Sequence, residues 1–286
     1  MTSALPHIDA YLARRLVESQ FPQWSGLPLT LLDAVGSDHV IYRLGEHLTV
    51  RLPRHDGAVH QARKEMAWLP RIAPLLPLAI PEPVAVGEPG LGYPWHWAVA
   101  RWLDGVPATV EALGASTEAA RVLAEFLLAL QGFPPDGGPG AELLAARETE
   151  TRAAIDAVGE DFDRGAMIQL WEAALAAPSW ERLPVWFHGD FHTGNLLTAG
   201  GRVTAVLDFG GLGTGDPAPD LMIAFTLFSE GPRSVFRDVL GCDDATWLRG
   251  RGWALATGLS AYTAYAHTRP AVAAQTRRQI IAALEG

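Results

Sequence analysis

The sequence predicts an α+β protein with two parts, a small antiparallel sheet followed by a mainly helical region. Short alternating segments separated by turn residues fill the first hundred residues, whereas apolar residues recur at helical spacing beyond them. The charge changes at the same place. Residues 1–103 carry nine basic and nine acidic residues, whereas residues 104–286 carry 13 basic and 23 acidic ones. We therefore expect one domain over 1–103 and a second over 104–286.

The first part begins with extended segments in residues 28–53. Val40, Tyr42 and Leu44 alternate with Ile41 and Arg43, which predicts a strand with these three apolar side chains on one face. After the turn "LGEH", the segment "LTVRL" predicts a second strand that Pro53 closes. The segment "HQARKEMAWLPRI" is helix-like until Pro70, and a proline-rich loop follows. "WHWAVARWL", residues 95–103, predicts a buried strand, so the first part is expected to be a small sheet with one helix.

The second part is expected to be mostly helix. "TEAARVLAEFLLALQGF" carries apolar residues at helical spacing, and Gly132 and the following prolines end it. Residues 141–177 are helix-prone. "GNLL" and "RVTAVLDF", separated by two glycines, predict a short hairpin-like pair. In "DPAPDLMIAFTLF", Asp216 is the expected N-cap and Pro217 the first helical residue, and the remainder of the chain reads as helical.

Bulk composition restricts the class of protein. Apolar residues make up 49% of the chain, which is ample for a core. The only cysteine, Cys242, allows no internal disulfide and fits a reducing compartment. The N-terminus lacks a signal-peptide pattern and no apolar run spans a bilayer, so we expect a soluble cytoplasmic protein without a membrane partner. The net charge of −10 disfavours nucleic acid as a partner and suits a cationic small molecule, although acidic surfaces also serve solubility alone.

The segment "WFHGDFHTGNLL", residues 186–197, places several polar residues in an apolar frame. One interpretation is a metal-dependent hydrolase that binds zinc or a metal pair through His188, Asp190, His192 and Asp208. The sequence offers no further histidine at a metal-ligand spacing and no nearby cysteine. A dinucleotide site at "VLDFGGLGTGDP" is disfavoured, because its glycines are spaced G-x-G-x-G.

Phosphoryl transfer uses more of these residues. Asp190 is followed five residues later by Asn195, and thirteen residues after that by Asp208 in "DFG". Such a reaction uses one carboxylate to orient the acceptor hydroxyl and accept its proton, while an amide oxygen and a second carboxylate hold magnesium. His188 would then be a scaffold residue bonded to the backbone, and His192 a loop residue.

"HGDFHTGN" followed by "VLDFG" resembles the catalytic and metal loops of the aminoglycoside phosphotransferases and their relatives, which are small-molecule kinases with a two-lobed, protein-kinase-like fold. "GDPAPDL" also resembles that family, where it starts a helix behind the site. The resemblance runs from about Leu31 to about Leu227 and is strongest over 186–221. It implies that Asp190 is the catalytic base and that Asn195 and Asp208 bind Mg²⁺. His188 and Asp216 would support them.

The resemblance also implies that the first part is a nucleotide-binding N-lobe for ATP or GTP. Arg51 falls where the family places the strand lysine that contacts the phosphates, and Glu65 falls at its helix partner. The strand lysine itself is absent, since the only lysine is Lys64. "VGSDHVIYRL" is a poor glycine-rich loop, and "VARWLDG" falls at the hinge. The implied nucleotide-binding residues are Arg51, Glu65, Ser37, Arg101, Trp102 and Leu103.

Taken together, these features predict a phosphotransferase that moves the γ-phosphate of ATP or GTP to a hydroxyl of a small molecule. The acidic second part favours a cationic acceptor, with an aminoglycoside antibiotic first among the candidates. Two alternatives stay open: the metal-dependent hydrolase described above, and a non-catalytic member of the fold that binds nucleotide without turnover. The acceptor hydroxyl, the choice between ATP and GTP, and the oligomeric state are left open by the sequence.

Overall fold

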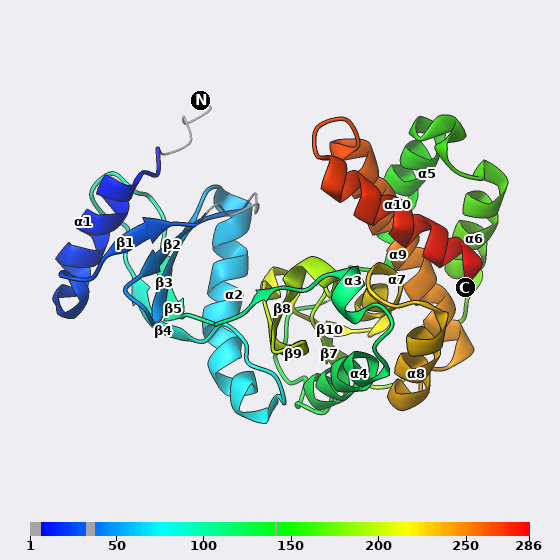
Figure 1. The fold of residues 1–286 in the computed structure, drawn as a ribbon, viewed down its shortest axis with the longest axis horizontal. Coiled ribbons are helices and arrows are strands. Elements are labelled where there is room, and N and C mark those ends of the chain that lie inside the picture. Colours follow the sequence, from blue (N-terminus) through cyan, green and yellow to red (C-terminus); the bar gives the residue numbers. More distant parts are fainter. Residues whose placement is uncertain (1–6, 33–37, 141) are drawn as a thin grey trace. The chain divides into compact units, whose positions relative to one another are not determined.

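The computed structural model describes residues 7–32, 38–140 and 142–286. The chain divides into two compact units (Figure 1). Unit 1 contains the residues up to Gly105 together with the short segment Ala205–Gly211, and unit 2 contains Val106–Thr204 and Leu212–Gly286. A sheet forms the centre of unit 1, whereas helices dominate unit 2.

Unit 1 is built on a five-stranded antiparallel sheet with the strand order β1-β2-β3-β5-β4. Its strands are β1 (Leu29–Leu31), β2 (His39–Leu44), β3 (Leu48–Pro53), β4 (Pro83–Gly87) and β5 (Trp97–Arg101). Tyr42 lies opposite Val50, and Val50 lies opposite Val99, so three buried side chains line up across the middle of the sheet. Alternation along β2 therefore places Val40, Tyr42 and Leu44 against the core, as the sequence predicted.

Two long helices accompany this sheet, one more than the sequence analysis allowed. Helix α1 (Ala10–Gln20) starts at Asp9, whose carboxylate accepts a hydrogen bond from the Leu12 N–H at 2.8 Å. Helix α2 (Asp56–Ile72) continues through Pro70, so the prediction that Pro70 ends it was wrong. Pro70 lies in the last turn, where its missing N–H removes one hydrogen bond, to the carbonyl four residues before it, and only two helical residues follow.

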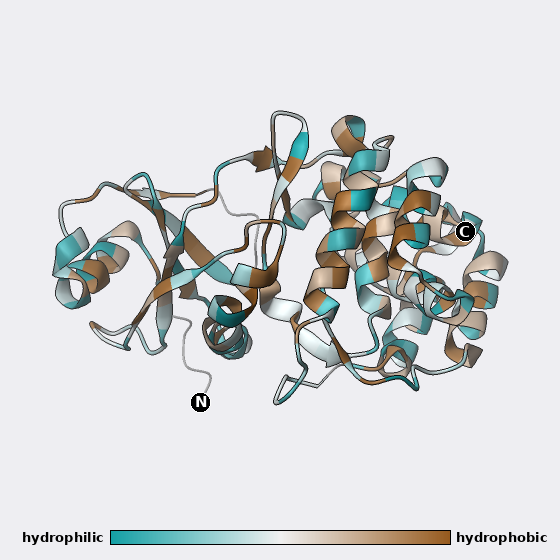
Figure 2. Ribbon diagram, turned by 90° about the horizontal axis from the view of Figure 1, so that it is seen from below, coloured by the Kyte–Doolittle hydropathy of each residue, from teal (hydrophilic) through white to brown (hydrophobic). Residues whose placement is uncertain are grey.

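Eight helices of unit 2 are α3 (Val110–Leu113), α4 (Thr117–Gln131), α5 (Glu148–Ala157), α6 (Arg164–Ala176), α7 (Met222–Thr226), α8 (Glu230–Leu240), α9 (Asp244–Tyr265) and α10 (Pro270–Glu285). Helix α9 packs against α5, α6, α7 and α10, and α4 packs against α8. Figure 2 shows hydrophobic and hydrophilic residues mixed along these helices, as expected where one side faces a core. Helix α4 occupies the segment that the sequence predicted and ends at Gly132 as expected, and the structure shows that Ser116 caps its start.

Short strands frame the polar segment of unit 2. Strand β7 (Val185–Phe187) ends immediately before it and pairs antiparallel with β10 (Gly213–Gly215). Strand β8 (Leu196–Ala199) begins immediately after it and lies between β6 (Val106–Pro107) and β9 (Arg202–Val206). The predicted hairpin is therefore β8–β9, and the segment from His188 to Asn195 connects two anchored strands. Within the described parts of the chain, no helix combines the length and apolar character of a membrane span.

Candidate active site

The loop between β7 and β8, His188–Asn195, is held by a buried carboxylate from elsewhere in unit 2. Asp220 accepts the backbone N–H of His188 at 2.7 Å through one oxygen and that of Gly189 at 2.8 Å through the other. Gly189 adopts a φ of 83°, which glycine reaches without strain. This turn directs the following residue, Asp190, away from the core, and the Asp190 side chain is 48% exposed.

Asp190 and Asn195, which the sequence predicted as base and metal ligand, meet in this loop. The Asn195 side-chain amide donates to the Asp190 carbonyl oxygen at 2.9 Å and to its carboxylate at 3.0 Å. His192 Nε2 lies 3.5 Å from the same carboxylate. Burial acts to raise the pKa of Asp190, but the hydrogen bond and charge of His192, with smaller effects of His188 and Asn195, bring the pKa below its usual value. Asp190 is therefore ionised at neutral pH and able to accept a proton.

The two histidines of the loop have structural surroundings. The ring of His188 is fully buried, and its Nδ1 accepts the Asp190 N–H at 3.2 Å. His192 Nδ1 accepts the Gly194 N–H at 3.0 Å. Among the described residues, no group of three or more His, Cys, Asp or Glu side chains is arranged to hold a metal ion. The loop's own His188, Asp190 and His192 therefore form no such metal-ligand group.

The supporting aspartate of the loop is Asp220, which the sequence analysis did not single out. It expected Asp216 to support the site and to cap the next helix. The Asp216 carboxylate accepts the Ala218 N–H at 3.0 Å and pairs with Arg249 at 2.6 and 3.0 Å, so it stabilises the start of this segment instead of touching the loop. The segment begins as a 3₁₀ turn, Ala218–Leu221, before α7. In the sequence Asp220 is only an aspartate next to an apolar run, and the structure shows that its side chain is fully buried.

In unit 1, Arg51 on β3 and Glu65 on α2 form the ion pair that the resemblance implied. Their nitrogen–oxygen distances are 2.8 and 3.4 Å, and only 12% and 6% of the two side chains is exposed. Burial raises the pKa of Glu65 and the nearby Asp208 adds to this, while Arg51 opposes it. The planar guanidinium has further N–H groups beyond the two used here, which suits phosphate binding.

Asp208 lies on a separate turn of unit 1, next to α2. Its backbone has a φ of 58°, its side chain is exposed, and its carboxylate accepts the Gly210 N–H at 3.3 Å. The chain's only lysine, Lys64, donates to the Gly210 carbonyl oxygen at 2.6 Å and so ties α2 to this turn. From the sequence, Lys64 was expected only to lie beside Glu65, and its bond to Gly210 was not predicted.

The three expected hinge residues differ in what their backbones can offer. The Arg101 N–H donates to the Glu82 carbonyl at 2.9 Å and the Trp102 N–H to the His47 carbonyl at 2.8 Å. Within the described chain, the Leu103 N–H takes part in no such hydrogen bond. The Trp102 ring is covered by the Arg43 guanidinium at 4.4 Å. Ser37, the other expected nucleotide contact, lies outside the described residues.

Asn195 and Asp208 each offer an oxygen donor of the kind that magnesium prefers. The Asn195 amide nitrogen is committed to Asp190, so its oxygen is the atom left for a cation. The exposed Asp208 carboxylate is a second oxygen donor. Magnesium prefers a few protein oxygens of this kind and completes its shell with water and phosphate oxygens.

Comparison with known proteins identifies a family and a fold. Residues 32–254 match the model of a family described as the phosphotransferase enzyme family. No curated protein matches the chain by sequence. The solved structures that share its fold include a GDP complex of aminoglycoside 2'-phosphotransferase-IIIa, a macrolide 2'-phosphotransferase from Brachybacterium faecium, and a streptomycin–ATP complex of APH(2")-IIa.

These likenesses extend over nearly the whole chain. The identities are 19%, 23% and 16% and the TM-scores are 0.76, 0.64 and 0.62, in the same order. They cover 97%, 94% and 90% of this chain and 99%, 98% and 91% of the others. At these identities the likeness establishes the kinase-like fold of these enzymes, with an antiparallel sheet in the N-terminal part and a mainly helical C-terminal part.

Proposed function

Since this chain belongs to the phosphotransferase enzyme family, we propose that it transfers the γ-phosphate of ATP or GTP to a hydroxyl of a small molecule. The observation that carries the proposal is the pair of Asp190 and Asn195, bonded to each other in a loop that Asp220 holds from behind. An ionised, half-exposed carboxylate at the end of a rigid turn is suited to orienting an acceptor hydroxyl and taking its proton.

The other residues have roles that follow from their chemistry. Arg51, held by Glu65, binds the phosphates of the nucleotide, and the Leu103 N–H meets its base. Asn195 and Asp208 hold Mg²⁺ through oxygen atoms. When bound, the ion would supply charge neutralisation for the phosphates, and Asp190 acts on the acceptor hydroxyl. His188 and Asp220 keep the loop in shape and do not touch substrate.

For the acceptor we propose a cationic antibiotic of the aminoglycoside type. The support is electrostatic: the second part of the chain carries the whole net charge of −10, with 13 basic and 23 acidic residues after position 103. Such a field concentrates cations and repels polyanions. The solved structures of similar fold include a complex with streptomycin, and they also include a macrolide phosphotransferase. Both antibiotic classes are therefore candidates. With such an acceptor, the enzyme would confer antibiotic resistance.

A thermal-shift titration tests the donor half of the proposal. ATP and GTP are each added with and without Mg²⁺, and zinc alone serves as the contrast. A ligand that binds only the folded state raises the melting temperature by mass action. We expect a magnesium-dependent shift with a nucleotide, lost in Asp208→Ala. Stabilisation by zinc alone, without a nucleotide effect, would contradict the proposal.

The acceptor half is tested by mass spectrometry. Candidate aminoglycosides and macrolides are incubated with enzyme, Mg²⁺ and nucleotide, and the products are examined for the mass gain of one phosphate. Nucleotide binding without any phosphorylated product, and without slow release of nucleoside diphosphate, would identify a non-catalytic member of the family. Product formation that survives in Asp190→Ala would remove Asp190 from the base role.

A further inference from the structure

We infer that the Thr226 hydroxyl is a second anchor of the catalytic loop and that Arg278 keeps Thr226 in place. Both residues lie in unit 2, outside the motifs that identify the site, and Thr226 is the last residue of α7. The inference rests on the proposed function only in naming the reaction that the loop performs. The anchoring itself is a statement about hydrogen bonds in the folded chain.

The anchor contacts the loop between its two functional residues. Thr193 follows Asp190 by three residues and precedes Asn195 by two. Its backbone N–H donates to the Thr226 hydroxyl oxygen at 3.3 Å, and its own hydroxyl donates to the same oxygen at 3.2 Å. The Thr226 hydroxyl in turn donates to the Ile223 carbonyl at 3.4 Å. One oxygen atom thus receives two hydrogen bonds from the loop and passes one to α7.

Both partners of this contact are buried, so loss of the contact would affect the loop. Thr193 is 4% exposed and Thr226 is fully buried. A buried donor that loses its acceptor cannot form a hydrogen bond with water instead. The loop would therefore have to move to give the Thr193 N–H and hydroxyl new acceptors. Thr193 begins the short 3₁₀ turn Thr193–Asn195, whose position sets where Asn195 meets Asp190. Thr226 therefore fixes the second half of the loop, whereas Asp220 fixes the first half.

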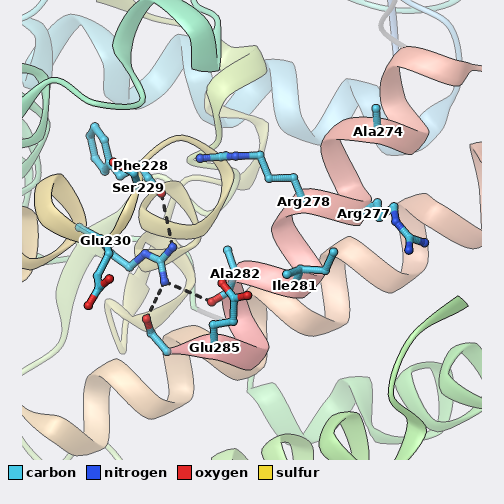
Figure 3. A pocket seen from close by; sticks show the side chains of 11 residues that line it. Phe228, Ser229, Glu230, Ala274, Arg277, Arg278, Ile281, Ala282 and Glu285 are labelled. Carbon is cyan, nitrogen blue, oxygen red and sulfur yellow. Dashed lines mark hydrogen bonds between the residues drawn. The ribbon is translucent and has the colours of Figure 1, made fainter.

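Arg278 on α10 holds the anchor from its other side. Its guanidinium donates to the Thr226 carbonyl at 2.6 Å and to the Leu227 carbonyl at 2.8 Å. Carbonyls at the end of a helix lack partners within the helix, and an arginine is well suited to satisfy two of them. Figure 3 shows the Arg278 side chain reaching from α10 toward Phe228 and Ser229, along the wall of a groove of about 780 Å³. The anchor thus connects this groove to the catalytic loop.

Two substitutions separate the hydroxyl from the rest of the side chain. Thr226→Val keeps the shape and removes the hydroxyl, whereas Thr226→Ser keeps the hydroxyl and removes the methyl group. The readouts are hydrogen exchange of loop peptides, nucleotide affinity, and turnover measured as release of nucleoside diphosphate. Thr276→Val is the matched control, because Thr276 is a buried threonine of unit 2 whose hydroxyl bonds only within α10.

We expect Thr226→Val to speed exchange in peptides covering 188–197 while leaving exchange in α4 and α9 unchanged. Turnover should fall by about tenfold to a hundredfold, as for other small misplacements of reacting groups. The nucleotide dissociation constant should stay within about threefold, since an anchoring group acts on positioning and not on uniform binding. Thr226→Ser should restore both loop exchange and turnover to near the original values, and Thr276→Val should leave both unchanged.

Arg278→Lys and Arg278→Met complete the test. Lysine can bond only one carbonyl well, so we expect an intermediate loss of loop protection, and methionine should give the full loss. Unchanged loop exchange and turnover in Thr226→Val would overturn the inference, as would a Thr226→Ser variant as defective as valine. If the unmodified enzyme turned over no nucleotide, the proposed function would fail. Loop exchange in these variants would still decide whether Thr226 holds the loop.

Discussion

Arg51 on β3 donates two hydrogen bonds to Glu65 on α2, at 2.8 and 3.4 Å, and both side chains are almost completely enclosed. A buried ion pair is stable only while both partners are present, because each charge has lost its hydration shell. In this chain the pair also joins the sheet to the helix that carries Lys64. The pair therefore links the stability of unit 1 to the residue proposed to bind phosphate.

We expect Glu65→Ala to lower the free energy of unfolding by about 3–5 kcal/mol, since it leaves the Arg51 charge buried and unpaired. Urea unfolding measures this loss directly. Glu46→Ala is the matched control, because Glu46 is 86% exposed and removing an exposed charge changes stability by less than about 0.5 kcal/mol. Equal effects of the two substitutions would mean that the buried pair contributes no more than a surface one.

Asp190→Asn keeps the size of the side chain and an oxygen that Asn195 can reach, but removes the basic carboxylate. We expect turnover to fall by about 10²- to 10⁴-fold, the usual contribution of a positioned general base. The affinity for Mg²⁺-nucleotide, measured by calorimetry, should change little. A variant that retained turnover within a few-fold of the original enzyme would show that another group accepts the proton.

His192→Ala distinguishes the kinase chemistry from histidine-based metal chemistry. His192 bonds the Gly194 N–H and lowers the pKa of Asp190, so it assists the loop without being required for proton transfer. At pH 8, where Asp190 is ionised in either case, we expect turnover within about tenfold of the original. A loss of several hundredfold, recovered by added zinc or manganese, would instead assign the histidine to a metal.

The sequence predicted the parts of the fold that depend on local patterns. Helix α4 follows from apolar residues at helical spacing and from Gly132 at its end, and β2 follows from the alternation of Val40, Tyr42 and Leu44 with Ile41 and Arg43. Helix α1 was not predicted, although Asp9 is a common N-cap residue, because the apolar stripe of this helix is short. The return of Ala205–Gly211 to unit 1 depends on long-range contacts, including the Lys64 bond to Gly210, which no local pattern encodes.

In the candidate site too, some residues could be predicted from local sequence patterns, whereas others depend on long-range contacts. Asp190, Asn195 and Asp208 could be proposed because their spacing is fixed by one continuous segment. Asp220 could not be assigned, because its role arises from contacts with backbone atoms about thirty residues away in the chain. Arg51 and Glu65 were identified only through the family resemblance, and the structure then placed them within hydrogen-bonding distance.

The last prediction concerns pH and depends on Asp220. Burial raises the pKa of Asp220 to about 7, against the effect of the Gly189 and His188 N–H groups. Burial disfavours the charged form, so the contribution of Asp220 to the free energy of unfolding is greatest below the ordinary aspartate pKa. This contribution is lost as the pH rises through 7. The hold of Asp220 on the loop, in contrast, becomes stronger as the pH rises. An ionised carboxylate accepts stronger hydrogen bonds from backbone N–H groups than a protonated one.

We therefore expect turnover to rise with pH through about 7 while Asp190, whose pKa is lowered, stays ionised over the whole range. Asp220→Asn should remove this rise and give a lower rate throughout, because its amide offers one acceptor to two N–H donors. The measurement is turnover at saturating nucleotide from pH 5.5 to 8.5, in both proteins. The nucleotide phosphates titrate in the same range in both, so only a rise that disappears in Asp220→Asn belongs to Asp220. An identical profile in the two proteins would show that Asp220 anchors the loop equally well in either protonation state.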